Sequence, residues 1–231
     1  ICGSVKKVIF SDSPRSMDIT LVHGVNADHY SSSNHHIIAA SICDVVGTAP
    51  VLSIMSDLCE IKSAFLQTLH PWLSYQNMMD GPLNQDVIQD PRGKAYGVGR
   101  ATPGNLIPKN TSLGDALNKV IPELKGKTTT MSFRIPTEIV GSCSMILEMS
   151  KPLDNHTIIK HLISHSKSPI VECCDEPLIS SDFKHHESSC IIDTRWVETN
   201  NQHVRIVTWY DNEWGYVNRL YDTINLVADK F

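Results

Sequence analysis

Cys43 and His70 are the two residues whose types and positions best fit covalent chemistry. Cys43 follows a β-like apolar run and begins an i, i+3, i+4 apolar pattern, which predicts a helix from the thiol to about Leu58. The helix dipole and the unpaired backbone N–H groups at that end stabilise a thiolate. His70 ends a second apolar run, a predicted strand, and histidine is a natural base for cysteine. The pair could therefore attack an electrophilic carbon, although spacing alone favours a buried structural cysteine beside an unrelated histidine.

The composition is that of an ordinary globular protein with a small excess of acidic residues. Of its 231 residues, 41% are hydrophobic and 19% are charged, and the formal net charge is -5. This length is sufficient for a sizeable core in one or two domains. The charge offers no electrostatic case for a nucleic-acid or membrane partner, and no apolar run reaches membrane-spanning length.

The number and spacing of the cysteines indicate the redox compartment of the protein, and the first residues indicate whether the chain is a fragment. The seven cysteines are an odd number without a C-x-x-C pair, which argues against a disulfide framework and a zinc ribbon. A reducing compartment is the simpler interpretation, so we expect a cytoplasmic protein. No signal peptide is visible, and the chain opens in mid-pattern at Ile1. We therefore expect a fragment or a product cut from a longer precursor.

Two further patterns resemble binding motifs, and we assign a ligand to neither. The histidine pairs at 35–36 and 185–186 suggest a metal, but adjacent strand residues point to opposite faces, so we expect solvated surface and no metal site. The Gly97-Val98-Gly99 sequence lacks the third glycine of a dinucleotide-binding turn and runs into Pro103, so we predict a loop.

Hydrophobic periodicity predicts an α+β fold, a mostly antiparallel mixed sheet with helices on one side. Besides the run that ends at His70, strands are predicted over Val5–Phe10, Ile19–Val25, Thr128–Ile135, Ile139–Met149, Cys190–Val197 and His203–Trp209. Besides the helix that begins at Cys43, helices are predicted over Thr111–Val120, Lys151–Ser164 and Trp214–Phe231.

A series of sequence blocks carries a family resemblance over nearly the whole chain. The blocks are VHGVNADHY, IIAASICDVVGTAP, LHPWLSYQNMMDGP, GRATPGNLIPKNTS, LNKVIPELKGKTTTMSFRIPT, ISSDF, SSCIID and VTWYDNEWGYVNRLYD. In order and approximate spacing they resemble the phosphorylating glyceraldehyde-3-phosphate dehydrogenases. The resemblance implies that residues 1–42 are the last strands of a truncated NAD(P)-binding Rossmann domain, that 43–212 form a catalytic domain, and that 213–231 form a C-terminal helix that packs back on the Rossmann part.

The resemblance also implies roles for individual side chains in the substrate site. Cys43 is the nucleophile and His70 its base. Arg134, in SFRIPT, matches the arginine that holds the substrate phosphate, a role suited to a bidentate guanidinium; a surface ion pair is the alternative. Thr111 matches a threonine of the second phosphate site, or is a plain helix cap.

Contacts to NAD or NADP follow from the same resemblance. Asn212, in WYDNEWGY, matches the asparagine that orients the nicotinamide carboxamide, and Tyr216 matches a tyrosine close to it. The alternative is that this aromatic strand end only fills the core. The segment Pro71–Gly104 matches a loop that lines the cofactor site of a neighbouring subunit, and it is several residues longer than is typical of the family.

The chain departs from the family pattern around the nucleophile. The usual serine before it and the two threonines and the asparagine after it are replaced by Ile42, Asp44, Val45 and Val46, and a threonine and a glycine elsewhere by Leu73 and Ser112. The Asp44 carboxylate repels phosphate and raises the pKa of the thiol. The nucleophile, the base and the substrate arginine therefore persist, while much of the inorganic-phosphate site does not.

Two functional hypotheses follow from this combination. The first is an oxidoreductase that oxidises glyceraldehyde 3-phosphate or a related phosphorylated aldehyde through a thioester on Cys43, with hydride transfer to NAD or NADP. The second is a catalytically inactive structural or binding protein of the same family, suggested by the missing cofactor half and the altered phosphate site. The resemblance further implies a homo-oligomer, a tetramer, or a missing N-terminal segment that covers an exposed apolar face.

Overall fold

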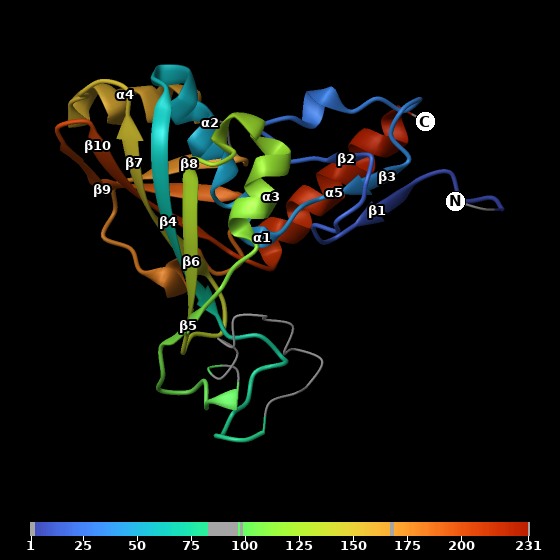
Figure 1. Cartoon of the computed structure of the whole chain (residues 1–231), viewed down its shortest axis with the longest axis horizontal. Coiled ribbons are helices and arrows are strands. Elements are labelled where there is room, and N and C mark those ends of the chain that lie inside the picture. The colour runs from blue at the N-terminus through green and yellow to red at the C-terminus, as the bar shows by residue number, and fades with distance from the viewer. Residues whose placement is uncertain (1–2, 83–96, 98, 167–168, 231) are drawn as a thin grey trace.

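The computed structural model describes residues 3–82, 97, 99–166 and 169–230, which form two sheets and several helices (Figure 1). The strands are β1 (Val8–Phe10), β2 (Ile19–Thr20), β3 (Ile37–Ala39), β4 (Ile61–Pro71), β5 (Ile107–Lys109), β6 (Thr128–Ile135), β7 (Gly141–Met149), β8 (Val171–Cys174), β9 (Cys190–Asn200) and β10 (His203–Tyr210). The helices are α1 (Cys43–Val46), α2 (Ala49–Leu58), α3 (Leu113–Val120), α4 (Asn155–His165) and α5 (Trp214–Asp229), with 3-10 turns at Ala27–His29, Pro122–Leu124 and Ser180–Phe183.

The larger sheet is mixed and mostly antiparallel, which confirms the predicted fold class. Its strand order is β5-β6-β4-β7-β10-β9-β8. β4 pairs with β6 and β8 pairs with β9 in parallel, while the other neighbours are antiparallel. The parallel register of β4 and β6 places His70 directly opposite Arg134. Two side chains of the predicted site are therefore neighbours on paired strands.

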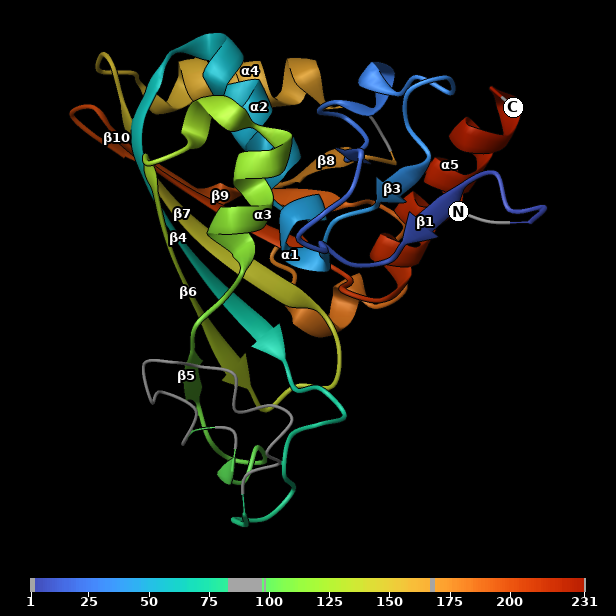
Figure 2. The same cartoon turned by 45° about the vertical axis from the view of Figure 1, so that its right-hand side comes forward.

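Helices cover one face of this sheet, as predicted. Along β4, buried and exposed residues alternate, which is typical of a strand with one face on the core. The covered face packs against α1, α2, α3 and α4, through buried side chains such as Leu52, Leu117 and Leu162. Figure 2 shows α2, α3 and α4 gathered over the sheet. The opposite face leaves Phe65 and Ile146 exposed.

A smaller parallel sheet, in the order β1-β3-β2, precedes the nucleophile. The C-terminal helix α5 lies against it, and Val227 joins a buried cluster with Leu21, Tyr30 and Ile38. Because β3 runs directly toward α1, this sheet sets the position from which the chain enters the site. In the described part of the chain, no helix is long and apolar enough to cross a membrane.

The structure corrects the single helix predicted from Cys43 to Leu58. α1 ends at Val46, Gly47 occupies its C-cap, and α2 begins at Ala49 with Pro50 in its first turn. Proline lacks a backbone N–H and is favoured at a helix start, so it begins a new helix here rather than continuing the old one. The apolar period alone did not reveal this break.

Other predicted elements were wrong in extent or absent from the predictions. The strand expected over Ile19–Val25 ends at Thr20, because the N–H groups of Val25 and Asn26 turn back to the Val22 carbonyl, both at 3.1 Å. β5 and β8 were not predicted, since IPK and VECC are short and carry proline or charge. The histidine pairs lie outside strands, so the strand argument used for them was wrong. The long loop predicted after Pro71 lies partly outside the described residues.

Candidate active site

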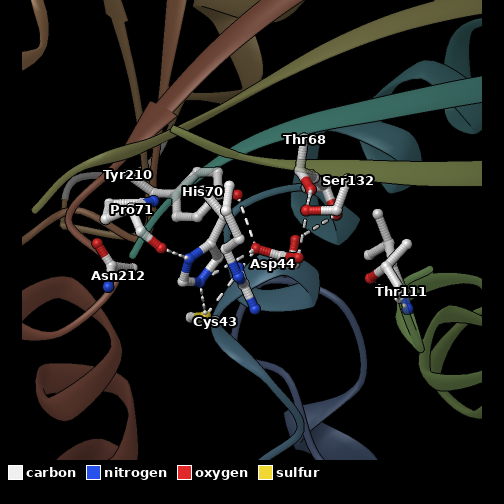
Figure 3. Close-up of polar contacts among 12 residues, drawn as sticks. Cys43, Asp44, Thr68, His70, Pro71, Thr111, Ser132, Tyr210 and Asn212 are labelled. Atoms are coloured by element: carbon white, nitrogen blue, oxygen red, sulfur yellow. Dashed lines mark hydrogen bonds and ion pairs between the residues drawn. The ribbon is translucent and has the colours of Figure 1, made fainter. Parts of the chain in front are cut away.

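The ends of two elements bring Cys43 and His70 together. Cys43 is the first residue of α1, and His70 is the penultimate residue of β4. Cys43 Sγ lies 3.4 Å from His70 Nε2, as Figure 3 shows. The thiol is half-buried and the imidazole is buried. A sulfur and a ring nitrogen at this distance can exchange a proton.

A backbone hydrogen bond sets the tautomer of His70. Its Nδ1 lies 2.7 Å from the Pro71 carbonyl oxygen, and because a carbonyl can only accept, Nδ1 carries the proton. Nε2 of the neutral ring is therefore an acceptor that faces the thiol. Burial lowers the pKa of His70, Asp44 opposes that shift, and the positive charge of Arg134 adds to it. The imidazole is thus neutral at neutral pH and ready to accept a proton.

Asp44 is buried next to the pair and is held by residues from the sheet. The Tyr210 hydroxyl donates a 2.8 Å hydrogen bond to Asp44 Oδ1, and Thr68 Oγ1 lies 3.5 Å from Oδ2. Asp44 Oδ1 is 3.9 Å from His70 Nε2 and 4.0 Å from Cys43 Sγ. A carboxylate therefore shares the site with the nucleophile and the base (Figure 3).

The surroundings of Cys43 favour the thiol over the thiolate. Burial raises the pKa of Cys43, and the negative charge of Asp44 raises it further; backbone N–H groups and Arg134 oppose both. The predicted increase in the pKa of Cys43 by Asp44 is confirmed. The N–H groups at the helix end lower this pKa, as predicted, but α1 has only four residues and desolvation outweighs their contribution. The cysteine therefore needs His70 to take its proton during attack.

Arg134 belongs to a positive cluster beside the base. It is 6% exposed, and its Nη2 donates a 3.2 Å hydrogen bond to the Tyr75 hydroxyl. Lys109 Nζ lies 5.6 Å from the centre of the Tyr75 ring. Burial raises the pKa of Tyr75, but Arg134 and Lys109 outweigh it, so this pKa is lowered. The cluster suits an anionic group of a ligand next to His70.

Sequence reasoning missed Lys109, Tyr75 and Tyr210 as parts of this site. Lys109 stands two residues before Thr111, and Tyr210 two residues before Asn212, so both lie inside blocks that had already been singled out. A basic residue near a predicted anion site was a usable signal for Lys109. Nothing in the sequence indicated that Tyr210 contacts Asp44, because that contact depends on the fold.

Thr111 and Ser112 lie apart from the nucleophile. Thr111 Oγ1 accepts a 3.1 Å hydrogen bond from the Leu113 N–H at the start of α3, which is the capping alternative raised above. Ser112 is the exposed N-cap residue of α3, and its side chain makes no capping bond. Figure 3 shows Thr111 on the far side of Asp44 from His70. Thr111 also lines a polar hollow with Thr128.

Ile42 lies directly before the nucleophile, and Leu73 lies two residues after the end of β4. Ile42 is the N-cap of α1, and its carbonyl accepts 3.0 Å hydrogen bonds from the N–H groups two and three residues after Cys43. Its apolar side chain packs against the core. Leu73 lines a hollow that includes Glu138 and Glu213, which is a poor environment for phosphate.

Asn212 and Tyr216 each hold a strained backbone residue near the site. Asn212 Oδ1 accepts a 3.0 Å bond from the N–H of Val140, which has φ of 70°. The Tyr216 hydroxyl donates a 3.0 Å bond to the carbonyl of Ser41, which has φ of 63°. Left-handed backbone is costly for residues other than glycine and concentrates at functional sites. Both side chains therefore have a structural role here.

Residues 42–212 match a protein-family sequence model described as the C-terminal domain of glyceraldehyde 3-phosphate dehydrogenase. The chain belongs to the glyceraldehyde-3-phosphate dehydrogenase family. Its curated relatives include a glyceraldehyde-3-phosphate dehydrogenase of Kitasatospora aureofaciens, 31% identical over 98% of this chain and 66% of the relative. A cytosolic form from Chlamydomonas reinhardtii is 35% identical over 100% of this chain and 66% of the relative.

The relatives are longer than this glyceraldehyde-3-phosphate dehydrogenase-family chain. A chloroplastic form from Guillardia theta is 35% identical over 99% of this chain, which covers 58% of that relative. The chain thus spans about two thirds or less of the curated relatives that it matches. Family membership accounts for the mixed sheet and the helices that cover it.

Proposed function

We propose that this chain is the catalytic part of an oxidoreductase that oxidises glyceraldehyde 3-phosphate or a related phosphorylated aldehyde. The observation that carries the proposal is the 3.4 Å approach of Cys43 Sγ to His70 Nε2, with Arg134 opposite His70 on the paired strand. A nucleophile, its base and a buried guanidinium for the substrate phosphate are thus adjacent. Relatives named as glyceraldehyde-3-phosphate dehydrogenases support the assignment.

The chain's own residues can perform the covalent steps. Cys43 gives its proton to Nε2 of His70 while the sulfur forms a bond to the aldehyde carbon, and the carbonyl electron pair moves to oxygen. The protonated Nε2 then donates a hydrogen bond to that oxyanion. When a hydride leaves the carbon, the C=O bond re-forms and a thioester on Cys43 results. An acceptor that attacks the thioester carbon releases the Cys43 thiolate, which takes its proton back from Nε2 of His70 and completes the turnover.

A bound nicotinamide dinucleotide, NAD or NADP, supplies the hydride acceptor in this scheme. We propose that Asn212 and Tyr216 hold its nicotinamide end. Asn212 uses its oxygen on the Val140 N–H, so the N–H donors of the amide are not engaged in that bond. Tyr216 is anchored through its hydroxyl to the Ser41 carbonyl, which fixes the position of its ring.

The acceptor of the acyl group is the part of the reaction in which this chain departs from its family. The negative charge of Asp44 lies beside the sulfur and repels inorganic phosphate. Thr111 uses its hydroxyl to cap α3. We therefore propose an altered acyl acceptor or an altered aldehyde, with the substrate phosphate still bound by Arg134 and Lys109.

The proposal is tested by substrate protection and by turnover. Glyceraldehyde 3-phosphate should protect Cys43 of the wild-type chain from iodoacetamide. Arg134→Met should abolish that protection, measured as the ratio of alkylation rates with and without the aldehyde, because the loss of the Arg134 charge also changes the unprotected rate. Cys43→Ser in the complete protein should abolish aldehyde-dependent reduction of NAD or NADP. Unchanged turnover in Cys43→Ser would remove the covalent mechanism.

A second candidate function is a catalytically inactive structural or binding protein of the same family. The raised pKa of Cys43 favours it, because a protonated thiol is a weak nucleophile. Alkylation by limiting iodoacetamide separates the two candidates. Selective labelling of Cys43 supports the enzyme, whereas equal labelling of all cysteines supports the inactive protein.

Assembly and location are parts of the same proposal. We propose a homotetramer, or a chain completed by an N-terminal segment, in the cytoplasm. Val217, Tyr221 and Ile224 form an exposed apolar stripe on α5, and such a stripe is normally covered by another segment or subunit. Sedimentation measurements on the complete protein would test the tetramer.

A further inference from the structure

We propose that Cys43, Asp44 and His70 form a binding site for a thiophilic divalent metal ion, with Zn²⁺ as the best fit. Among the residues that the structure describes, these three are a group whose possible ligand atoms all lie within 4.8 Å of one another. Cysteine, histidine and aspartate are all ligands that Zn²⁺ accepts. The inference goes beyond the proposed function and does not depend on it.

The separations of the ligand atoms are close to those around a tetrahedral ion. Cys43 Sγ and His70 Nε2 are 3.4 Å apart, and Asp44 Oδ1 lies 3.9 Å from the nitrogen and 4.0 Å from the sulfur. Bond lengths of about 2.0–2.3 Å place the ligand atoms of tetrahedral zinc about 3.4–3.6 Å apart. A movement of Asp44 of roughly half an ångström therefore completes the geometry.

Hydrogen bonds to His70 and Asp44 orient both side chains in the way that metal ligands are usually oriented. His70 donates its Nδ1 proton to the Pro71 carbonyl at 2.7 Å, so Nε2 presents a lone pair toward the group. Asp44 Oδ1 accepts the Tyr210 hydroxyl at 2.8 Å and keeps a second lone pair for an ion. Ligand orientation is thus set before an ion binds (Figure 3).

Charge balance makes Asp44 the decisive ligand. A thiolate and a carboxylate together neutralise a divalent ion, whereas a thiolate alone would leave a net positive charge opposite Arg134, which pairs with His70 on the adjacent strand. Three protein ligands leave a fourth position for water or a small anion. An ion held here occupies both the Cys43 sulfur and the His70 ring nitrogen, so neither atom is free to react while the ion is bound.

Zinc binding to the full, reduced and metal-free chain tests the proposal. Equilibrium dialysis against Zn²⁺, with a chelating dye as competitor, should find a single tightly held ion per chain. Cys43→Ser and Asp44→Asn should each weaken binding by more than about tenfold. Cys173→Ser, which removes another half-buried thiol, is the matched control and should bind as the wild type does. Equal zinc affinity in the wild type and Asp44→Asn would overturn the proposal.

Cobalt spectroscopy of the wild type gives a second test that needs no variant. Co²⁺ should produce a thiolate-to-metal charge-transfer absorption, and alkylation of Cys43 should abolish it. A Co²⁺ complex without that absorption would also overturn the site. Failure of this proposal is distinguishable from failure of the proposed function, because aldehyde protection of Cys43 is measured without metal and zinc uptake is measured without aldehyde.

Discussion

The hydroxyl of Tyr210 donates a hydrogen bond to Asp44 Oδ1 over 2.8 Å, although 166 residues separate the two in the sequence. The bond joins the last residue of β10 to the first turn of α1. It holds a carboxylate beside Cys43. Burial is the main cause of the raised pKa of the Cys43 thiol, and the negative charge of Asp44 raises this pKa further. A residue near the C-terminal end of the chain therefore contributes to the reactivity of the cysteine.

Asp44→Asn should make Cys43 more reactive. The amide keeps the shape of the side chain and still accepts the Tyr210 hydrogen bond, but its loss of charge lowers the pKa of the thiol. A fall of one pKa unit multiplies the thiolate fraction about tenfold. We therefore expect iodoacetamide to alkylate Cys43 faster than in the wild type at neutral pH, as measured by peptide mass spectrometry. Cys173 in the same molecule is the internal control, and an unchanged rate at Cys43 would contradict the electrostatic role of Asp44.

Stability should decline on both sides of neutral pH. Burial lowers the pKa of His70, so the unfolded chain binds more protons once the pH falls below about 6.5, and the free energy of unfolding decreases there. Burial and Asp44 raise the pKa of Cys43, so the unfolded chain loses a proton that the folded chain keeps above about pH 8.5, which again lowers the free energy of unfolding. Denaturant titrations across both limits measure these effects.

Two variants separate these limbs of the pH profile. His70→Gln should make the acid limb shallower and leave the alkaline limb, and Cys43→Ser should do the reverse. Part of each slope remains, because burial also lowers the pKa of His23 and raises the pKa values of Cys143 and Cys190. A profile of His70→Gln that runs parallel to the wild type below neutral pH would show that the imidazole is not buried in its neutral form.

Ser41→Gly should stabilise the fold. Ser41 is 0% exposed, has φ of 63°, and its hydroxyl has no partner among the described residues. Glycine accepts this backbone without strain and removes a buried polar group, which together outweigh its greater freedom in the unfolded chain. We expect a gain of about 1 kcal/mol in the free energy of unfolding. Ser41→Ala keeps the backbone strain and removes only the hydroxyl. If alanine increased the free energy of unfolding more than glycine does, the strain argument would be wrong.

Gly47→Ala should destabilise the fold through Tyr210. A Cβ at Gly47 would lie 2.5 Å from the ring carbons of Tyr210, so the ring must move and its bond to Asp44 must lengthen. Overpacking of this kind costs about 1–3 kcal/mol, which urea denaturation with an unchanged m-value would measure. Tyr210→Phe removes the same hydrogen bond without crowding and is the comparison variant. Wild-type stability in Gly47→Ala would show that the ring has room that the structure does not give it.

Most strands and helices were predictable, because the spacing of apolar residues in each segment has the period of its secondary structure. Thr128–Ile135 was predicted with both ends correct, and His203–Tyr210 was predicted one residue short. The helix break at Gly47 was missed, since the apolar spacing continues through it. Apolar spacing thus predicts where helices and strands lie, whereas a break inside such a pattern, as at Gly47, is seen only in the structure.

The candidate site was predictable only in its residue types. Cys43 and His70 were paired on their chemistry and on family resemblance, and the fold brings them within 3.4 Å. Thr111 was grouped with them from the same resemblance, and its hydroxyl accepts a hydrogen bond from the Leu113 N–H at the start of α3. The Tyr210–Asp44 bond is a product of tertiary packing, and no spacing in the sequence encodes it.

The proton on His70 is held by a main-chain carbonyl, that of Pro71. Every amino acid supplies that oxygen, so no codon change at position 71 deletes the acceptor. The tautomer of His70 therefore depends on the path of the backbone at Pro71 and not on the identity of a side chain. A chain that loses a substrate contact through substitution of a side chain elsewhere in the site therefore keeps an imidazole whose Nε2 can receive a proton.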